Sequence, residues 1–288
     1  MDSELLGGLL VAAAAVCWAA AAILYRRGMT RLADPLTGCW ARAPLALLVM
    51  TIAWLLIDPR PPPLQSLPVC IAAGILIGVT GDGLYMAALR DASVSTVYPI
   101  AYTYIVIASA AAVLVLGERL TPGLVAAVAL VMAGVYAASR ESGGGGGGTR
   151  LRGVLEVLGA SVSWGLGVLA AKVAAVEAGP LQLNIVKLLV ILLLLAPYAA
   201  PRLARMLRGR GVGWVVAGGV LGIGIGDLFF YAGLPLIGAA RATVVSTISL
   251  PTSMLLSALA LREKPSIWEL LGACLIVAGI VSLVLLGG

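Results

Sequence analysis

The sequence of 288 residues contains no histidine, and its cysteines are few. Without an imidazole there is no Ser-His-Asp triad, no histidine proton relay and no histidine metal ligand. The cysteines lie in apolar stretches without CxxC spacing, which excludes a disulfide framework and a zinc site: Cys17, Cys39, Cys70 and Cys274. No ATP-binding motif is present either. We therefore expect no bound metal, no cofactor and no enzymatic activity.

Charged residues are also scarce, at 11% of the chain, whereas apolar residues make up 61% and mean hydropathy is +1.08. A soluble domain has about 25% charged residues and cannot hide so much apolar surface. The composition therefore predicts an all-α integral protein of the cell membrane, with lipids as partners. The net charge of +6 is spread over short loops, so it concerns membrane orientation, and no nucleic-acid partner is expected. An acidic start, Met1-Asp2-Ser3-Glu4, predicts no cleavable signal peptide.

Long apolar runs are abundant. A membrane-spanning helix needs about 20 mostly apolar residues. Ten segments meet that requirement, and short loops rich in Arg, Pro and Gly join them. The predicted spans are 5–25, 36–57, 67–89, 93–116, 122–138, 153–171, 181–199, 213–236, 240–261 and 267–286.

The ten predicted spans form two copies of five. Residues 142–149 read SGGGGGGT, a flexible tether. On either side of it the same residues recur 145 positions apart: Pro35 and Pro180, Arg42 and Lys187, Asp82 and Asp227, Glu118 and Glu263. We therefore predict repeats at 1–141 and 150–288, with 142–149 as linker. Because five is odd, the second copy enters the membrane from the opposite side, and such inverted repeats are typical of secondary transporters.

Four ionisable residues lie well inside the predicted spans: Arg42, Asp82, Lys187 and Asp227. A charge in the membrane costs several kcal/mol unless it is paired or reaches water, so each is a candidate functional residue. Counting about 1.5 Å per residue, each base lies at the depth of one aspartate. We predict two ion pairs, Arg42–Asp82 and Lys187–Asp227, one in each half of the membrane. They either hold helices together or line and gate a central cavity.

Polar and aromatic residues share helix faces with these charges. Tyr85 and Tyr231 follow the two aspartates by about one turn, and Asn184 precedes Lys187. Tyr98 and Tyr102, with Ser95 and Ser109, follow helical spacing in the fourth span, as do Ser246, Ser249, Ser253 and Ser257 in the ninth. Such stripes either line a cavity or bond to backbone. Pro99 and Pro251 are expected to kink these two spans.

The duplicated pattern resembles the EamA-type members of the drug/metabolite transporter superfamily over nearly the whole chain. The first half carries the resemblance through Trp18, Pro35, Arg42, Gly81-Asp82 with Tyr85, Tyr98-Pro99 and Leu116-Gly117-Glu118-Arg119. The second half repeats it as Trp164, Gly226-Asp227, Pro251 and Leu261-Arg262-Glu263-Lys264, with Arg262 where glycine is common. The resemblance implies ten spans and the export or exchange of small metabolites such as amino acids or sugars.

We expect a secondary transporter that moves a small polar metabolite by alternating access. Paired charges of both signs favour a zwitterion such as an amino acid, and aromatic residues, at 6%, are too few for a cage around bulky cations. The alternative is a flippase of lipids or lipid-linked metabolites. A remote alternative is an intramembrane aspartyl protease, because Gly224-Ile225-Gly226-Asp227 matches GxGD. That chemistry needs two adjacent carboxylates.

The orientation of the termini has two contradictory indications. Loops after odd-numbered spans carry thirteen Lys and Arg residues, whereas the others carry four. The positive-inside rule therefore places both termini outside. The resemblance implies that both termini lie in the cytoplasm. Both orientations stay open, as do monomer and homodimer.

Overall fold

The computed structural model describes residues 3–32, 34–117, 120–139, 147–174 and 178–286, and within these ranges all regular structure is helical. The first half consists of α1 Ser3–Leu32, α2 Pro35–Ala41, α3 Ala43–Ile57, η1 Leu64–Ser66, α4 Leu67–Gly74, η2 Ile75–Gly81, α5 Asp82–Asp91, α6 Val94–Ala101, α7 Tyr104–Leu116 and α8 Pro122–Ser139. Here η1 is a 3₁₀ turn and η2 a π-helix.

The second half consists of α9 Gly147–Ala174, α10 Pro180–Ala199, η3 Ala200–Arg202, α11 Leu203–Arg208, α12 Val212–Gly219, the π-helix η4 Val220–Gly226, α13 Asp227–Ile237, α14 Ala239–Ser246, α15 Ser249–Leu256, the π-helix η5 Ser257–Leu261 and α16 Ile267–Leu285. One prediction needs correction. The last three linker positions, 147–149, belong to α9, so the helix begins before the expected boundary at residue 150. Residues 142–146 lie outside the described ranges.

Most helical segments overlap the predicted spans, several of them as consecutive pieces, whereas α11 lies between two of those spans. Seven described segments are long and apolar enough to cross a membrane, and three apolar helices are shorter: Pro122–Ala138, Ser249–Leu261 and Ile267–Ser282. The chain is therefore a multi-pass membrane protein built from helices.

Helix irregularities recur at equivalent positions of the two halves. The π-helices η2 and η4 begin at Ile75 and Val220, 145 residues apart, and each ends directly before an aspartate. The fourth span breaks at Tyr102 and Thr103, and the ninth at Thr247 and Ile248, again 145 apart. The prolines are not equivalent. Pro251 explains the ninth break, because it cannot bond the Thr247 carbonyl four residues back, whereas Pro99 lies within α6, before the fourth break.

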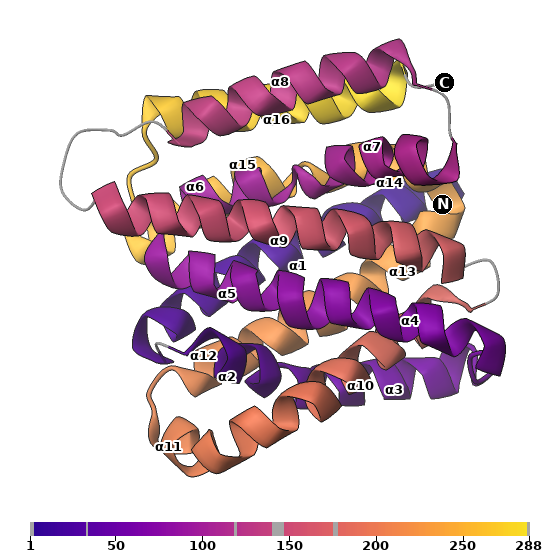
Figure 1. Cartoon of the computed structure of the whole chain (residues 1–288), viewed down its shortest axis with the longest axis vertical. Coiled ribbons are helices and arrows are strands. Elements are labelled where there is room, and N and C mark those ends of the chain that lie inside the picture. The colour runs from indigo at the N-terminus through magenta and orange to yellow at the C-terminus, as the bar shows by residue number, and fades with distance from the viewer. Residues whose placement is uncertain (1–2, 33, 118–119, 140–146, 175–177, 287–288) are drawn as a thin grey trace.

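The first helix of each half packs mainly against helices of the other half. The central helix α1 packs against α12, η4, α13 and α15, whereas α9 packs against α4, η2, α5 and α7 (Figure 1). Small residues permit the close approach. A Cβ atom at Gly28 would lie 2.3 Å from Val215, and one at Gly167 would lie 2.5 Å from Ile77. The two repeats therefore share one core.

Helices α8 and α16, the last of each half, lie side by side at one edge of the molecule (Figure 1). Their contact depends on two facing glycines. A Cβ atom at Gly134 would lie 2.8 Å from the Gly272 carbonyl oxygen, and one at Gly272 would lie 2.7 Å from the Gly134 oxygen. The two backbones therefore touch at this point.

We predict that Gly134→Val lowers stability by about 1–3 kcal/mol, because the added side chain forces α8 away from α16. The matched control is Gly8→Val in α1, where a Cβ atom meets nothing within 4 Å. Thermal unfolding of both purified variants in one detergent measures the difference. An equal melting temperature for the two variants would contradict the close packing.

Candidate functional site

Two aspartates occupy the same structural position in the two halves. Asp82 is the first residue of α5 and follows the π-helix η2, and Asp227 is the first residue of α13 and follows η4. A π-helix inserts extra residues per turn, which changes the direction of the following side chains and is frequent at functional sites. Asp82 is 6% exposed and Asp227 is 8% exposed, so both carboxylates depend on protein partners.

Each aspartate forms an ion pair with the base of its own repeat, as the sequence predicts. Arg42, at the turn between α2 and α3, is 2% exposed and its Nη2 binds Asp82 Oδ2. Lys187 Nζ lies 3.3 Å from Asp227 Oδ2. Asn184 donates to the same Asp227 oxygen at 3.3 Å. Both predicted pairs are therefore present in the structure.

A tryptophan from the opposite repeat completes each pair. Trp164 of α9 donates its Nε1–H to Asp82 Oδ1 at 3.0 Å, and Trp18 of α1 donates to Asp227 Oδ1 at 2.9 Å. The sequence singles out both tryptophans by their equivalent positions. It does not reveal their partners, because a spacing within one repeat carries no information about contacts with the other.

The glycine before each aspartate makes room for the indole. A Cβ atom at Gly81 would lie 2.3 Å from Trp164 Cδ1, and one at Gly226 would lie 2.9 Å from Trp18 Cδ1. No side chain larger than hydrogen fits at either place without moving the tryptophan. The duplicated Gly-Asp step is therefore a steric requirement of the contact between repeats.

The two bases also pack against the opposite repeat. A Cβ atom at Gly219 would lie 2.4 Å from the Arg42 carbonyl oxygen, and one at Gly74 would lie 3.2 Å from Lys187 Cα. Gly74 and Gly219 are equivalent positions, each the last residue before a π-helix. A Cβ atom at Gly78, four residues before Asp82, would lie 3.2 Å from Lys187 Cγ. Asp82 is also within electrostatic range of Lys187 and Asp227, so the two ion pairs form one central cluster.

Aromatic rings surround this cluster, and several were not predicted. Tyr85 lies 5.1 Å from Trp164 between ring centroids, as predicted for a residue beside Asp82. The unpredicted Tyr104 lies 6.1 Å from Trp164, and Phe230 lies 5.2 Å from Trp18. Tyr231 packs on the neighbouring core between α3 and α10.

Within the described part of the chain, three buried polar atoms near the charges make no hydrogen bond of regular geometry: Tyr25 Oη, Arg42 Nε and Asn184 Oδ1. The Arg42 guanidinium carbon lies 5.3 Å from the Tyr25 ring centroid. An unsatisfied buried donor or acceptor costs about 1–3 kcal/mol, and a polar ligand can recover that cost. The cluster therefore combines charges of both signs with unfilled hydrogen-bonding capacity.

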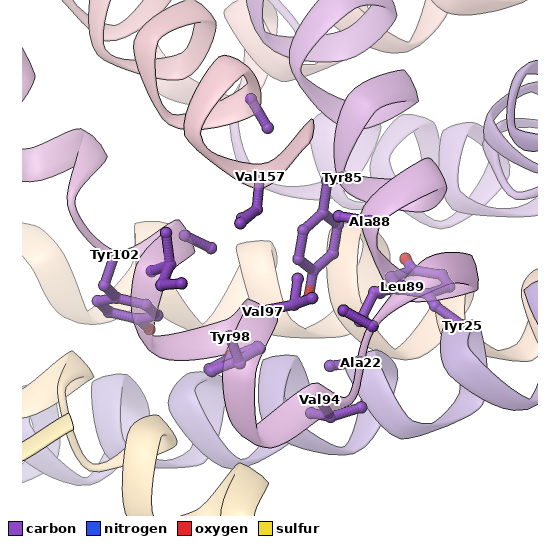
Figure 2. Packing of buried hydrophobic residues seen from close by; sticks show 14 of the residues in the cluster. Ala22, Tyr25, Tyr85, Ala88, Leu89, Val94, Val97, Tyr98, Tyr102 and Val157 are labelled. Carbon is purple, nitrogen blue, oxygen red and sulfur yellow. The ribbon is translucent and has the colours of Figure 1, made fainter. Parts of the chain in front are cut away.

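Tyr98 and Tyr102 belong to the buried cluster that also contains Tyr85, Val97 and Leu89 (Figure 2). At the break of the fourth span, Tyr102 Oη lies 2.5 Å from Ser249 Oγ and 3.2 Å from the Ser246 carbonyl oxygen. The broken spans of the two repeats therefore meet each other. Discontinuous helices of this kind form the central sites of many transporters.

The serine stripe of the ninth span bonds to its own backbone. Its four hydroxyls donate to carbonyl oxygens three residues earlier at 2.7–3.0 Å, and all four residues are at most 5% exposed: Ser246, Ser249, Ser253 and Ser257. Membrane-helix hydroxyls often bond to backbone in this way. Ser109 does the same with the Ile105 carbonyl oxygen at 3.0 Å. Ser249 Oγ also contacts the other repeat through Tyr102 Oη, which donates to the Ser246 carbonyl oxygen as well.

The remaining sequence candidates are distributed as follows. All four cysteines are free, and Cys39 Sγ donates to the Gly78 carbonyl oxygen at 3.1 Å. Glu118 lies outside the described residues. In Asp82 and in Asp227, Oδ1 accepts a hydrogen bond from a tryptophan and Oδ2 accepts one from a base. This pairing with bases and indoles differs from the two carboxylates sharing one proton that an aspartyl protease requires.

Comparisons with known proteins agree with this duplicated arrangement. The sequence model of the EamA-like transporter family matches residues 5–140 and 151–285. A solved crystal structure aligns with 96% of this chain and 95% of its own, at a TM-score of 0.59 and 21% sequence identity, which shows a similar fold. No curated protein matches the chain.

We predict that Gly81→Ala destabilises the protein by about 1–3 kcal/mol, because it displaces Trp164 and leaves the Asp82 oxygen unpaired. Gly224→Ala is the matched control, since the nearest atom to its Cβ is 3.6 Å away. Thermal unfolding of Gly81→Ala, Trp164→Phe and the double variant measures the coupling. We expect the double variant to lose less than the sum of the single losses, because one bond is broken by both changes. Strictly additive losses would contradict the steric role of Gly81.

Proposed function

Because the chain belongs to the EamA-like transporter family, we propose that it is a secondary transporter that moves a small polar metabolite across the cell membrane by alternating access. The observation that carries the proposal is the central cluster. Each aspartate is held by a base of its own repeat and a tryptophan of the other. A movement of one repeat against the other therefore changes the partners of both carboxylates.

Ten crossings in two inverted halves fit this proposal. The shorter helices α8 and α16 have 18 and 19 residues, or about 27 Å and 28 Å at 1.5 Å per residue, close to the hydrocarbon thickness. The ninth crossing is formed by α14, α15 and η5 together. With five crossings in each half, the second half enters the membrane from the opposite side, and the same elements can open to either face.

The substrate class follows from the chemistry of the cluster. A guanidinium and an ammonium lie beside two carboxylates, and the buried Asn184 Oδ1 and Arg42 Nε make no regular hydrogen bond to any described residue. A zwitterion such as an amino acid offers both a carboxylate for the bases and an ammonium for the acids, so it can exchange with the internal ion pairs. With no ATP-binding motif in the chain, export or exchange would draw on a solute gradient.

A flippase is less well supported. A groove of about 450 Å³ opens between α7 and α8, lined by residues such as Ala110, Leu114 and Val125. All its lining residues are apolar, so it offers nothing to hold a headgroup. The charged cluster, in contrast, is buried among helices, and it fits a small polar solute better than a lipid.

We expect zwitterionic amino acids to raise the melting temperature of the purified protein, because a ligand that binds only the folded state stabilises it by about 2.7 kcal/mol at a hundred times its Kd. Neutral sugars, inorganic phosphate and phospholipids are tested beside them. Asp82→Asn and Asp227→Asn should fold, lose this stabilisation and lose uptake of the same amino acid into proteoliposomes.

The matched control for that experiment is Asp58→Asn, at the end of α3, where Asp58 pairs with the exposed Arg60 and not with the cluster. It should keep both binding and uptake. Stabilisation by phospholipid alone would favour the flippase. Unchanged uptake in both central asparagine variants would refute the proposed site.

A further inference from the structure

A second cross-repeat polar cluster lies at the end of the molecule where α1 and α5 end and α6 and α16 begin. Its centre is Glu263, in the turn after η5. Arg26 Nε lies 3.2 Å from Glu263 Oε1, and their side chains are 20% and 17% exposed. The second carboxylate oxygen accepts the Val94 N–H, at the start of α6, at 3.0 Å. One carboxylate of the second repeat thus holds two helices of the first.

Arg26 extends this contact to the turn between α5 and α6. Its Nη1 donates to the carbonyl oxygens of Leu89 and Arg90, each at 2.7 Å. The neighbouring Arg27 donates to the Ala260 carbonyl oxygen, at the end of η5, at 2.5 Å. Two adjacent arginines of α1 therefore bind both repeats at once.

A second carboxylate, Glu269 of α16, also binds the start of α6. Glu269 is 5% exposed, and its Oε1 accepts hydrogen bonds from Thr96 Oγ1 and from Ser93 Oγ, the latter at 3.2 Å. Its Oε2 accepts from the Ser266 N–H in a capping box. We name the set Arg26, Val94, Thr96, Glu263 and Glu269 the Glu263 latch. It joins α1 and α6 of the first repeat to the η5–α16 turn of the second.

At the opposite end of the molecule the latch residues are only partly repeated. Counting 145 positions, Glu263 corresponds to Glu118, which lies outside the described residues, and Glu269 corresponds to Leu124. Arg26 follows Trp18 by eight residues, as Lys172 follows Trp164. The two halves therefore share a base and an acid at these positions, whereas Glu269 occurs at the latch end alone.

We propose that the Glu263 latch is a gate that holds this face closed between the two repeats and must open before solute reaches the central cluster from this side. The proposal rests on the proposed transport function. In the structure these contacts bridge the two repeats, so this face is closed. Val97 lies about one helical turn after the latch residue Val94 in α6 and is 0% exposed (Figure 2).

Arg26 is the residue on which the latch depends most. Burial raises the pKa of the Glu263 carboxyl above its ordinary value, and Glu269 adds to the rise, whereas Arg26 and the Val94 N–H lower it. Removing Arg26 leaves a buried carboxylate without its cation. The closed latch then favours the protonated carboxyl, so its stability is present at low pH and is lost as pH rises through the raised pKa.

The test measures access to a cysteine beneath the latch, with Val97→Cys in a background lacking the four native cysteines. A membrane-impermeant maleimide is applied separately from each side of sealed vesicles. We expect Arg26→Gln to raise the labelling rate from the latch side about tenfold near pH 7.5, which corresponds to about 1.4 kcal/mol. Near pH 5 the ratio to Val97→Cys alone should fall back toward one.

Thr96→Val provides a second variant that keeps side-chain shape and removes the hydroxyl that binds Glu269 and Ser93. It should raise the rate about threefold, or about 0.65 kcal/mol. Arg60→Gln, which breaks the exposed pair with Asp58 far from the latch, is the matched control and should leave the rate unchanged. Unchanged labelling in both latch variants, or an equal rise in Arg60→Gln, would overturn the gate. Because no substrate enters this experiment, its outcome is independent of the binding test with Asp82→Asn.

Discussion

The structure depends on the burial of two carboxylates that neither repeat can stabilise alone. Asp82 and Asp227 are nearly inaccessible to solvent, and each receives one charged donor from its own repeat and one indole N–H from the other. An isolated ionised carboxylate is very costly in an apolar interior. Folding of each half around its charge therefore requires the other half, which is why α1 and α9 cross between the repeats.

Glycines and π-helices provide the space in which each repeat reaches the aspartate of the other. The π-helices η2 and η4 end at Gly81 and Gly226, so the first side chain beyond each is the aspartate. The glycines admit the tryptophans, and Gly74 and Gly219 admit the backbone of the two bases. These small residues let the helices of the two repeats approach closely around the tryptophans.

Exact symmetry does not extend from the centre to the Glu263 latch. A transporter with two identical halves has equal energies for its two open states, whereas contacts that differ between the two faces make them unequal. Arg26 and Glu263 recur as Lys172 and Glu118, but Glu269, which binds Thr96 at one face, is replaced by Leu124 at the other. The protein thus combines a duplicated centre with faces whose polar residues differ.

Much of this was predictable from the sequence. Apolar runs of spanning length determine membrane helices, and the recurrence of Arg42 and Asp82 as Lys187 and Asp227 determines two repeats with an ion pair in each, because a buried charge needs an opposite charge at its own depth. The role of the serine stripe stayed open in the sequence, since helical spacing cannot tell a hydroxyl that faces a cavity from one that bonds its own backbone. Only the tertiary structure decided that Trp18 and Trp164 bind the aspartate of the opposite repeat, and that Glu263 joins Arg26 to α6. Those contacts connect residues 209, 82 and 237 positions apart, and no local periodicity encodes how two helices so distant in the chain will meet.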